Sequence, residues 1–137
     1  MFKGTKVVIA GAVINFSLGV FYAWSVFAEG LILEYGWTQA EAALPYTVEL
    51  LIFGFAMIFA GRFQDQVGPR QAAIICGLLS GMALILCYFI LTPLSLTLFF
   101  GILFGISPAF GYAATTPTAM KWFPPEKRGL ITGFVVM

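Results

Sequence analysis

Few side chains in the long apolar stretches of this sequence could bind a ligand or exchange a proton. The chain has 137 residues, no histidine and only 9% charged residues. Glu49 is the only Asp, Glu, Lys or Arg inside an apolar stretch, and a carboxylate is costly in hydrocarbon unless it faces a cavity or a partner. Tyr22, Tyr112 and Asn15 add hydroxyl and amide groups. We expect these four residues to bind substrate in an internal cavity.

Glu49 allows two interpretations. It shares a predicted helix face with Tyr46 and Phe53, opposite a face of bulky aliphatic residues. In the functional interpretation, the carboxyl takes up a proton from one side of a membrane and releases it to the other. In the structural interpretation, a protonated carboxyl forms a hydrogen bond with a neighbouring helix. Both interpretations place the side chain inside the bundle.

The residue types disfavour enzymatic, metal and redox chemistry. No nucleophile is paired with a base, and the chain has no histidine for a metal or haem site. Cys76 and Cys87 are separated by about 16 Å along a helix, beyond the roughly 7 Å reach of a disulfide. We expect packing roles for both thiols, no enzyme activity, no cofactor and no metal. The net charge of +1 gives no indication of nucleic-acid binding.

The composition indicates a chain surrounded by lipid. Hydrophobic residues make up 61% of the sequence, more than a soluble domain of this size can bury. Stretches of about 20 apolar residues match the roughly 30 Å thickness of bilayer hydrocarbon. Spans are predicted near 7–28, 42–60, 71–91 and 95–120, and a fifth begins at Gly129. The sequence therefore predicts an all-α fold, a polytopic bundle of transmembrane helices.

Two further expectations concern the ends of the sequence. Lys3 and Lys6 precede an apolar run, as in a secretory signal, but the run is longer than usual and no small-x-small cleavage site follows it. A membrane anchor is the favoured interpretation. The fifth stretch, 129–137, corresponds to roughly 13 Å of helix, too short to cross a bilayer. We therefore expect residues 1–137 to be the front of a larger protein.

The positive charges predict how the chain threads through the membrane. All seven Lys and Arg residues lie before the first span, between the second and third, or between the fourth and fifth. Glu29, Glu34 and Glu41 lie in the loop on the other side. Because Lys and Arg accumulate in short cytoplasmic loops, we expect a multi-pass protein of the cell membrane with a cytoplasmic N-terminus.

Small residues predict which helix faces meet inside the bundle. At about 100° per residue, one stripe of the first span and one of the fourth combine small residues with a tyrosine. The two stripes are Gly11, Asn15, Gly19, Tyr22 and Val26, and Gly101, Gly105, Pro108, Tyr112, Thr115, Thr116 and Ala119. Both tyrosines are therefore expected to face a cavity. Trp24 falls on roughly the opposite face and is expected to be an anchor at the membrane surface.

One polar segment, FAGRFQDQVGPRQ (59–71), connects the second and third spans. Gly61 and Gly68 are expected to let the chain leave one helix and enter the next, because glycine tolerates conformations that other residues avoid. Asp65 is expected to accept backbone N–H groups at a helix start. Arg62 is interpreted as a topology charge.

This segment resembles the loop between helices 2 and 3 of the major facilitator superfamily, whose pattern is Gly-x-Leu-x-Asp-Arg-x-Gly-Arg-Arg/Lys. The residues that match in register are Gly61, Asp65, Gly68 and Arg70, and those that depart from the pattern are Phe63, Gln66 and Pro69. The resemblance implies a conformational switch formed by the matching residues. In it, Asp65 and Arg70 help to latch the two halves of a transporter on the cytoplasmic side.

Two other motifs resemble the oxalate/formate antiporter family within that superfamily. YAWS (22–25) is similar to its "YxWS" segment. Gly111-Tyr112, followed by KWFPPEKRG (121–129), is similar to its "GxxYG … KWFPDKRG" signature, with Pro125-Glu126 in place of a single Asp. The resemblance covers the whole chain.

The resemblance implies a fold of about twelve helices in two six-helix halves and transport by alternating access. Residues 1–137 would then be the first four helices and the start of the fifth. The implied substrate is a small organic anion, a carboxylate of the oxalate, formate or monocarboxylate type. It would be enclosed by aromatic residues such as Tyr22 and Tyr112 and carried by antiport or with a proton. The implied partners are this carboxylate, the lipid bilayer and the remaining helices.

An alternative function follows from the charges. Transporters of this kind pair the anion with basic residues of the second half, and no Lys or Arg lies inside a span here. A truncated or scaffold-type membrane protein without transport activity of its own is therefore the second hypothesis. The coding sequence beyond Met137 would discriminate between the two.

Overall fold

The computed structural model describes residues 2–136 of the chain, with side chains from residue 3 onward. These residues form α1 (Phe2–Ser17), η1 (Leu18–Phe21), α2 (Trp24–Tyr35), α3 (Gln39–Val67), α4 (Pro69–Phe89), α5 (Pro93–Leu96), η2 (Thr97–Phe104), α6 (Gly105–Met120), η3 (Pro125–Lys127) and α7 (Arg128–Val136). Four helical stretches are long and apolar enough to cross a membrane: Lys3–Tyr35, Gln39–Val67, Pro69–Phe89 and Pro93–Met120. The predicted all-α transmembrane bundle is confirmed.

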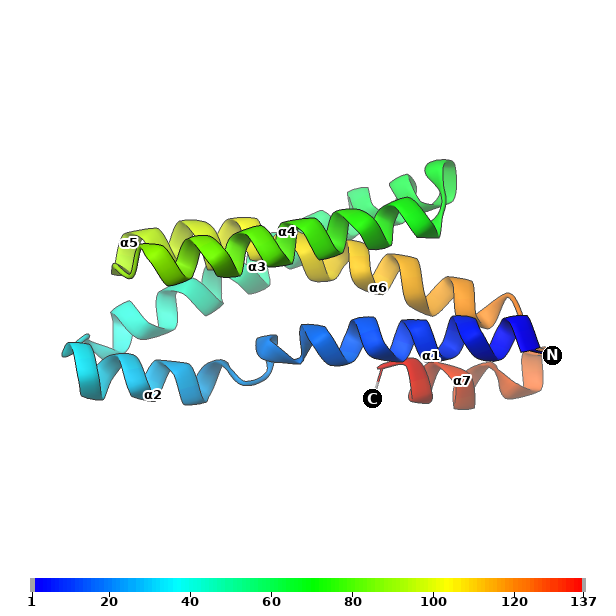
Figure 1. Cartoon of the computed structure of the whole chain (residues 1–137), viewed down its shortest axis with the longest axis horizontal. Coiled ribbons are helices and arrows are strands. Elements are labelled where there is room, and N and C mark those ends of the chain that lie inside the picture. Colours follow the sequence, from blue (N-terminus) through cyan, green and yellow to red (C-terminus); the bar gives the residue numbers. More distant parts are fainter. Residues whose placement is uncertain (1, 137) are drawn as a thin grey trace.

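The helices form an elongated bundle organised around α6 (Figure 1). This helix packs against α1, α3, α4 and α7, and η2 continues its contacts with α3 and α4. Helix α7 runs beside α1. The fourth membrane-spanning segment, η2 together with α6, is therefore the centre of the bundle.

Caps and glycines end the helices where the chain turns. Thr38 and Glu41 form a reciprocal capping box at the start of α3, and Thr92 and Ser95 form another at the start of α5. Gly36 ends α2 at φ 66°, and Gly68 lies at φ 109° just before Pro69, the first residue of α4. Local sequence thus accounts for the turns between α2 and α3, between α3 and α4, and between α4 and α5.

The first membrane-spanning segment is not one continuous α-helix, contrary to the prediction for 7–28. A 3₁₀ turn, η1, follows Ser17, and the helix resumes only at Trp24. Ser17 Oγ donates a hydrogen bond to the Val13 carbonyl oxygen, 2.9 Å away, and Gly19 lies in η1. Kinks commonly occur at such pairs of Ser and Gly. The break changes the helical phase of every residue that follows it.

The fourth membrane-spanning segment also departs from α-helical geometry. Residues Thr97–Phe104 form a π-helix, and α6 begins at Gly105. Pro108 lacks the N–H that an α-helix would donate to the Phe104 carbonyl, which favours a different hydrogen-bond pattern upstream. Both departures from the α-helix lie within the membrane-spanning segments.

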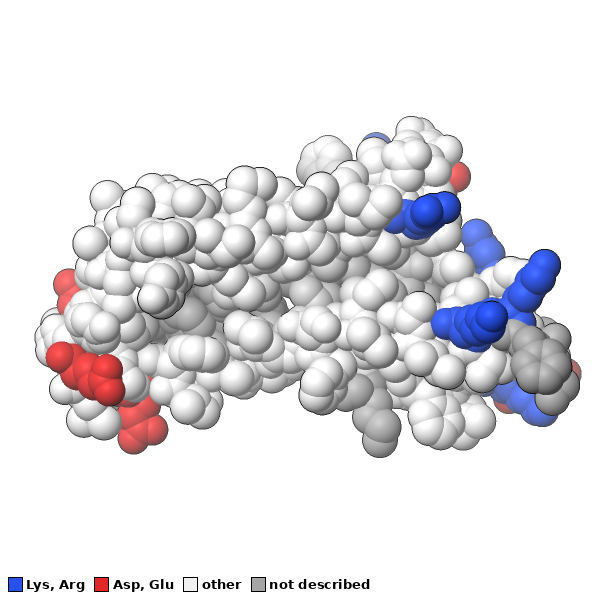
Figure 2. All heavy atoms as spheres, viewed as in Figure 1, with Lys and Arg blue, Asp and Glu red and all other residues white. Residues whose placement is uncertain are grey.

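Charged side chains separate to opposite ends of the bundle (Figure 2). Lys and Arg side chains gather at the end that carries the N-terminus, and most of the acidic side chains on this face lie at the other end. Between the two ends this face is without charge. An uncharged zone between two charged ends is the arrangement that a bilayer requires.

Substitution of a glycine that is crowded by the backbone of another helix should destabilise the bundle. A Cβ at Gly101 would lie 3.0 Å from Val48 Cβ and 3.1 Å from the Pro45 carbonyl oxygen. We expect Gly101→Ala to cost about 1–3 kcal/mol through overpacking and to lower the unfolding temperature in detergent, followed by circular dichroism. Gly81→Ala in α4 is the matched control, because nothing lies within 4 Å of its Cβ position. Equal unfolding temperatures for the two variants would contradict this account of the packing.

Candidate functional site

The first and fourth membrane-spanning segments meet at a pair of tyrosines. The hydroxyl oxygens of Tyr22 and Tyr112 lie 3.3 Å apart, and either can donate the hydrogen bond. Tyr22 is 69% exposed at the surface of the chain, and Tyr112 is half-buried in α6. The structure therefore brings together two of the four residues that the sequence assigned to substrate binding.

Aromatic rings surround this tyrosine pair. The Phe53 ring centroid lies 6.0 Å from that of Tyr112, in an edge-to-face arrangement. Phe21 packs edge-to-face on Tyr22, with centroids 5.0 Å apart. Such contacts fix the orientation of both phenol rings. The site combines two hydroxyl groups with an aromatic wall contributed by η1 and α3.

Glu49 does not share the exposed position of Tyr22. Its side chain is fully buried, with 0% of its surface exposed. Neither carboxyl oxygen has a hydrogen-bond partner among the described residues. The inward placement predicted from sequence is confirmed, but within this part of the chain the carboxyl has no partner of the kind that the structural interpretation required.

The fourth predicted site residue, Asn15, connects helices. Its side-chain nitrogen donates to the Val135 carbonyl oxygen at 2.6 Å and lies 3.4 Å from Thr115 Oγ1. Asn15 is buried, and its hydrogen bonds link α1 to α7 and α6 instead of to the tyrosine pair. This contact gives Asn15 a role in packing. Its assignment to substrate binding stays a prediction.

The loop motif has a different local structure from the one predicted. Helix α3 continues to Val67, so Gly61 lies inside a helix and does not let the chain leave it. Asp65 lies in the last turn of α3, and the N-cap of α4 is Gly68, so Asp65 does not cap a helix start. The prediction failed because α3, at 29 residues, is about 44 Å long and extends beyond roughly 30 Å of hydrocarbon.

Gly68 keeps its predicted role, because its positive φ produces the turn between the helices. Asp65 and Arg70 are exposed on either side of this turn. Neither makes an ion pair or a hydrogen bond with the rest of the described chain. Both side chains are therefore available to a partner outside these residues. Their role in a conformational switch stays a prediction.

Trp24 was assigned wrongly to the membrane surface. It is buried, its indole nitrogen donates to the Ala42 carbonyl oxygen at 3.0 Å, and its ring stacks on Phe100 with centroids 4.4 Å apart. The break at η1 changes the helical phase, so that Trp24 faces α3 and η2.

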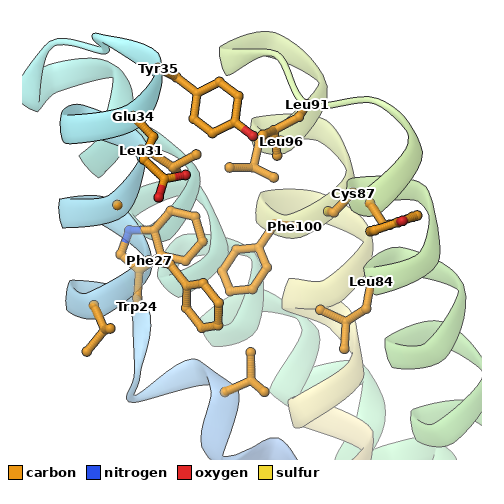
Figure 3. A pocket seen from close by; sticks show the side chains of 14 residues that line it. Trp24, Phe27, Leu31, Glu34, Tyr35, Leu84, Cys87, Leu91, Leu96 and Phe100 are labelled. Atoms are coloured by element: carbon orange, nitrogen blue, oxygen red, sulfur yellow. The ribbon is translucent and has the colours of Figure 1, made fainter.

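Trp24 and Phe100 also line an apolar pocket of about 380 Å³ between α2, α4 and η2 (Figure 3). Glu34 and Tyr35 line the same pocket.

Sequence reasoning missed Phe21 and the π-helix. Phe21 lies off the predicted stripe of the first span, because that stripe assumed an unbroken helix. The signal for the break was present in Ser17 and Gly19. The crowding of Gly101 and Gly105 against α3 agrees with the close packing predicted for these residues.

The geometry permits reversible binding and proton exchange. When one tyrosine hydroxyl donates to the other, the acceptor hydroxyl keeps its own proton free for a ligand. A carboxyl buried without a partner can accept a proton and lose its charge. The candidate functional groups are thus two phenol hydroxyls and an aromatic wall at the surface of the bundle and one acid buried within it.

Comparison with known proteins identifies the family. A search of curated proteins found no match to this chain. The model of the Major Facilitator Superfamily matches residues 9–137. This match agrees with the loop motif at 61–70 and with the helical bundle. The family consists of membrane transporters of small molecules. The chain belongs to the Major Facilitator Superfamily.

Proposed function

We propose that this protein is a secondary transporter of small organic anions, of the oxalate, formate or monocarboxylate type, which works by alternating access. The observation that carries the proposal is the hydroxyl pair of Tyr22 and Tyr112, at 3.3 Å, on the surface where the first and fourth segments meet. Within this pair one hydroxyl proton stays free, and an anionic oxygen is a strong acceptor for it. The aromatic rings of Phe21 and Phe53 limit the size of the ligand.

Two sequence motifs support the choice of a carboxylate. YAWS (22–25) and KWFPPEKRG (121–129) resemble segments of the oxalate/formate antiporter family. In the structure the inserted Pro125-Glu126 lies in a 3₁₀ turn, η3, between α6 and α7. The tyrosine pair lies elsewhere, in α6 and just after η1. This departure from the family motif therefore leaves the proposed binding groups unchanged.

The protein is proposed to lie in the cell membrane with its N-terminus in the cytoplasm. The separation of Lys and Arg from Glu29, Glu34 and Glu41 supports this orientation. In this orientation the turn at Gly68 is cytoplasmic, and Asp65 and Arg70 are proposed to bind the other half of the transporter in one of its two conformations. The exposure of both side chains supports that role.

Affinity measurements with tyrosine variants test the binding site. The protein expressed from its complete gene should bind oxalate or formate with about fivefold lower affinity after Tyr112→Phe, because one hydrogen bond of about 1 kcal/mol is lost. Tyr112→Ala should weaken binding further, because it also removes the ring. Tyr88→Phe, in an 83% exposed residue of α4, is the control and should leave affinity unchanged. Equal affinities for all variants would overturn the assignment.

Thiol labelling tests the orientation. Gln66, near the end of α3, and Gln39, at its start, are both exposed. In a background without Cys76 and Cys87, Gln39→Cys should react with an impermeant reagent in intact cells, whereas Gln66→Cys should react only after the cells are opened. The reverse order of labelling would show that the chain threads in the opposite direction.

Transport rates test the switch. Asp65→Asn should slow carboxylate transport severalfold without changing the concentration of substrate that half-saturates binding, because the residue acts on the conformational equilibrium. Glu126→Gln in η3 changes a charge in another loop at the same end and serves as the control. A loss of binding in Asp65→Asn, with normal insertion, would indicate instead that Asp65 contributes to the substrate site.

A further inference from the structure

Glu49 lies on a part of α3 that packs against two stretches that are not α-helical, η1 and η2. On one side of α3, the π-helix η2 and the start of α6 approach closely. A Cβ at Gly101 would lie 3.1 Å from the Pro45 carbonyl oxygen, and one at Gly105 would lie 3.1 Å from the Glu49 carbonyl oxygen. On an adjacent part of the α3 surface, Phe21 of the 3₁₀ turn η1 packs against Tyr46 and Phe53. Irregular helical turns within a span often mark functional sites and hinges.

Phe21 packs against two aromatic residues that flank Glu49 along α3. Tyr46 and Phe53 are three residues before and four residues after Glu49, on the same part of the α3 surface. The Phe21 ring centroid lies 5.5 Å from that of Tyr46 and 6.1 Å from that of Phe53. One ring therefore contacts the aromatic neighbours of Glu49 on both sides of it along the helix. The Glu49 side chain is fully buried, although Tyr22, the next residue after Phe21, is exposed.

No opposite charge lies near this carboxyl. The acidic and basic residues of the described chain lie outside 7–28, 50–60, 71–91 and 95–120. Tyr46 lies on α3 itself, and Tyr22 follows η1. The helices α2, α4 and α6, which pack against α3, carry the other titratable side chains: Glu29, Glu34, Tyr35, Arg70, Cys76, Cys87, Tyr88 and Tyr112. None of these forms a hydrogen bond with Glu49. The negative charge of an ionised carboxylate would be buried without a positive partner. A protonated carboxyl carries no charge and needs no such partner.

We propose that Glu49 is a proton-binding site and that Phe21 is the gate that connects it to the surface where Tyr22 and Tyr112 lie. In the structure described here the gate is closed and the carboxyl carries its proton. Movement of η1 lifts Phe21 away, water reaches Glu49, and the proton leaves. Because η1 also positions Tyr22, the same movement changes the tyrosine pair. The coupling of proton release to anion transport rests on the function proposed above. The proton-binding site at Glu49 and its gate at Phe21 are independent of that function.

Infrared spectroscopy of the protein in lipid tests the site without a transport assay. At neutral pH, Glu49 should give the carbonyl-stretch band of a protonated carboxyl, and Glu49→Gln should lack this band. Its deuterium exchange in heavy water should be slow and should accelerate about tenfold or more in Phe21→Ala, because the ring no longer limits opening. Phe16→Ala, in an 82% exposed residue of α1, is the matched control and should exchange as slowly as the unmodified protein.

Three results would overturn the inference. The band could be absent from the unmodified protein, it could persist in Glu49→Gln, or exchange could be as slow in Phe21→Ala as in the Phe16→Ala control. If Glu49→Gln does not insert, Glu49→Asp provides the assignment, because it retains an acid and shifts the band.

A second experiment tests the coupling. Net carboxylate uptake by Glu49→Gln should lose its pH dependence, while exchange of anion for anion persists. An unchanged pH profile, or a change in sodium dependence instead, would refute proton coupling through Glu49 and leave the carboxylate function standing. Absence of any carboxylate transport by the unmodified protein would refute that function, and the infrared result would still decide the proton site.

Discussion

The close approach of the fourth membrane-spanning segment to its neighbours determines the rest of the structure. Water cannot satisfy backbone groups in lipid, so the segment must be helical, and small residues then allow its backbone to approach other helices. Gly101 and Gly105 meet α3, and Gly111 meets Leu18 and Cys76. Ser107 strengthens the contact with α4 by donating to the Cys76 carbonyl oxygen at 2.9 Å. This packing fixes the positions of Tyr112 and Glu49.

Regular helices alone would not produce the site. An unbroken first segment would keep Tyr22 on the stripe of small residues that faces the bundle, with Trp24 on the outer face. After the turn at η1, Trp24 is buried and Tyr22 is exposed. On another part of the α3 surface, Gly101 of the π-helix packs against Pro45. Two irregular segments therefore pack against the helix that carries Glu49, and one of them is followed directly by Tyr22 of the phenol pair. Such segments can change conformation at lower cost than the helices that they connect.

The sequence was sufficient to predict the fold class, the membrane spans and the meeting of two helix faces. The fold class and the spans follow from the length of the apolar stretches, and the meeting of helix faces follows from the positions of small residues. Both features are visible in the sequence itself. Tyr22 and Tyr112 were each expected to face a cavity. The structure brings their hydroxyl oxygens to 3.3 Å from each other, and their role in a cavity stays a prediction. The inward position of Glu49 followed from the cost of a charge in hydrocarbon.

The predictions that failed depend on helical phase or on helix ends. Trp24 follows a break whose signal, Ser17 and Gly19, is weak in a single sequence. Gly61 and Asp65 were assigned to a loop because the segment is polar, but α3 extends beyond the hydrocarbon and keeps them helical. The π-helix has no clear sequence signal, because it depends on Pro108 together with the packing of α3.

The most direct test of the account asks whether the surface at the tyrosine pair faces water within the membrane. Tyr22 and Phe55 are almost equally exposed in the chain, at 69% and 66%, so burial cannot distinguish them. With Cys76 and Cys87 replaced, Tyr22→Cys and Phe55→Cys are treated with a hydrophilic thiol reagent in membranes, with and without a carboxylate. The account predicts that position 22 reacts, that the carboxylate protects it, and that position 55 does not react because it faces lipid. Equal reactivity at the two positions would contradict a water-filled substrate path beside Tyr22 and Tyr112.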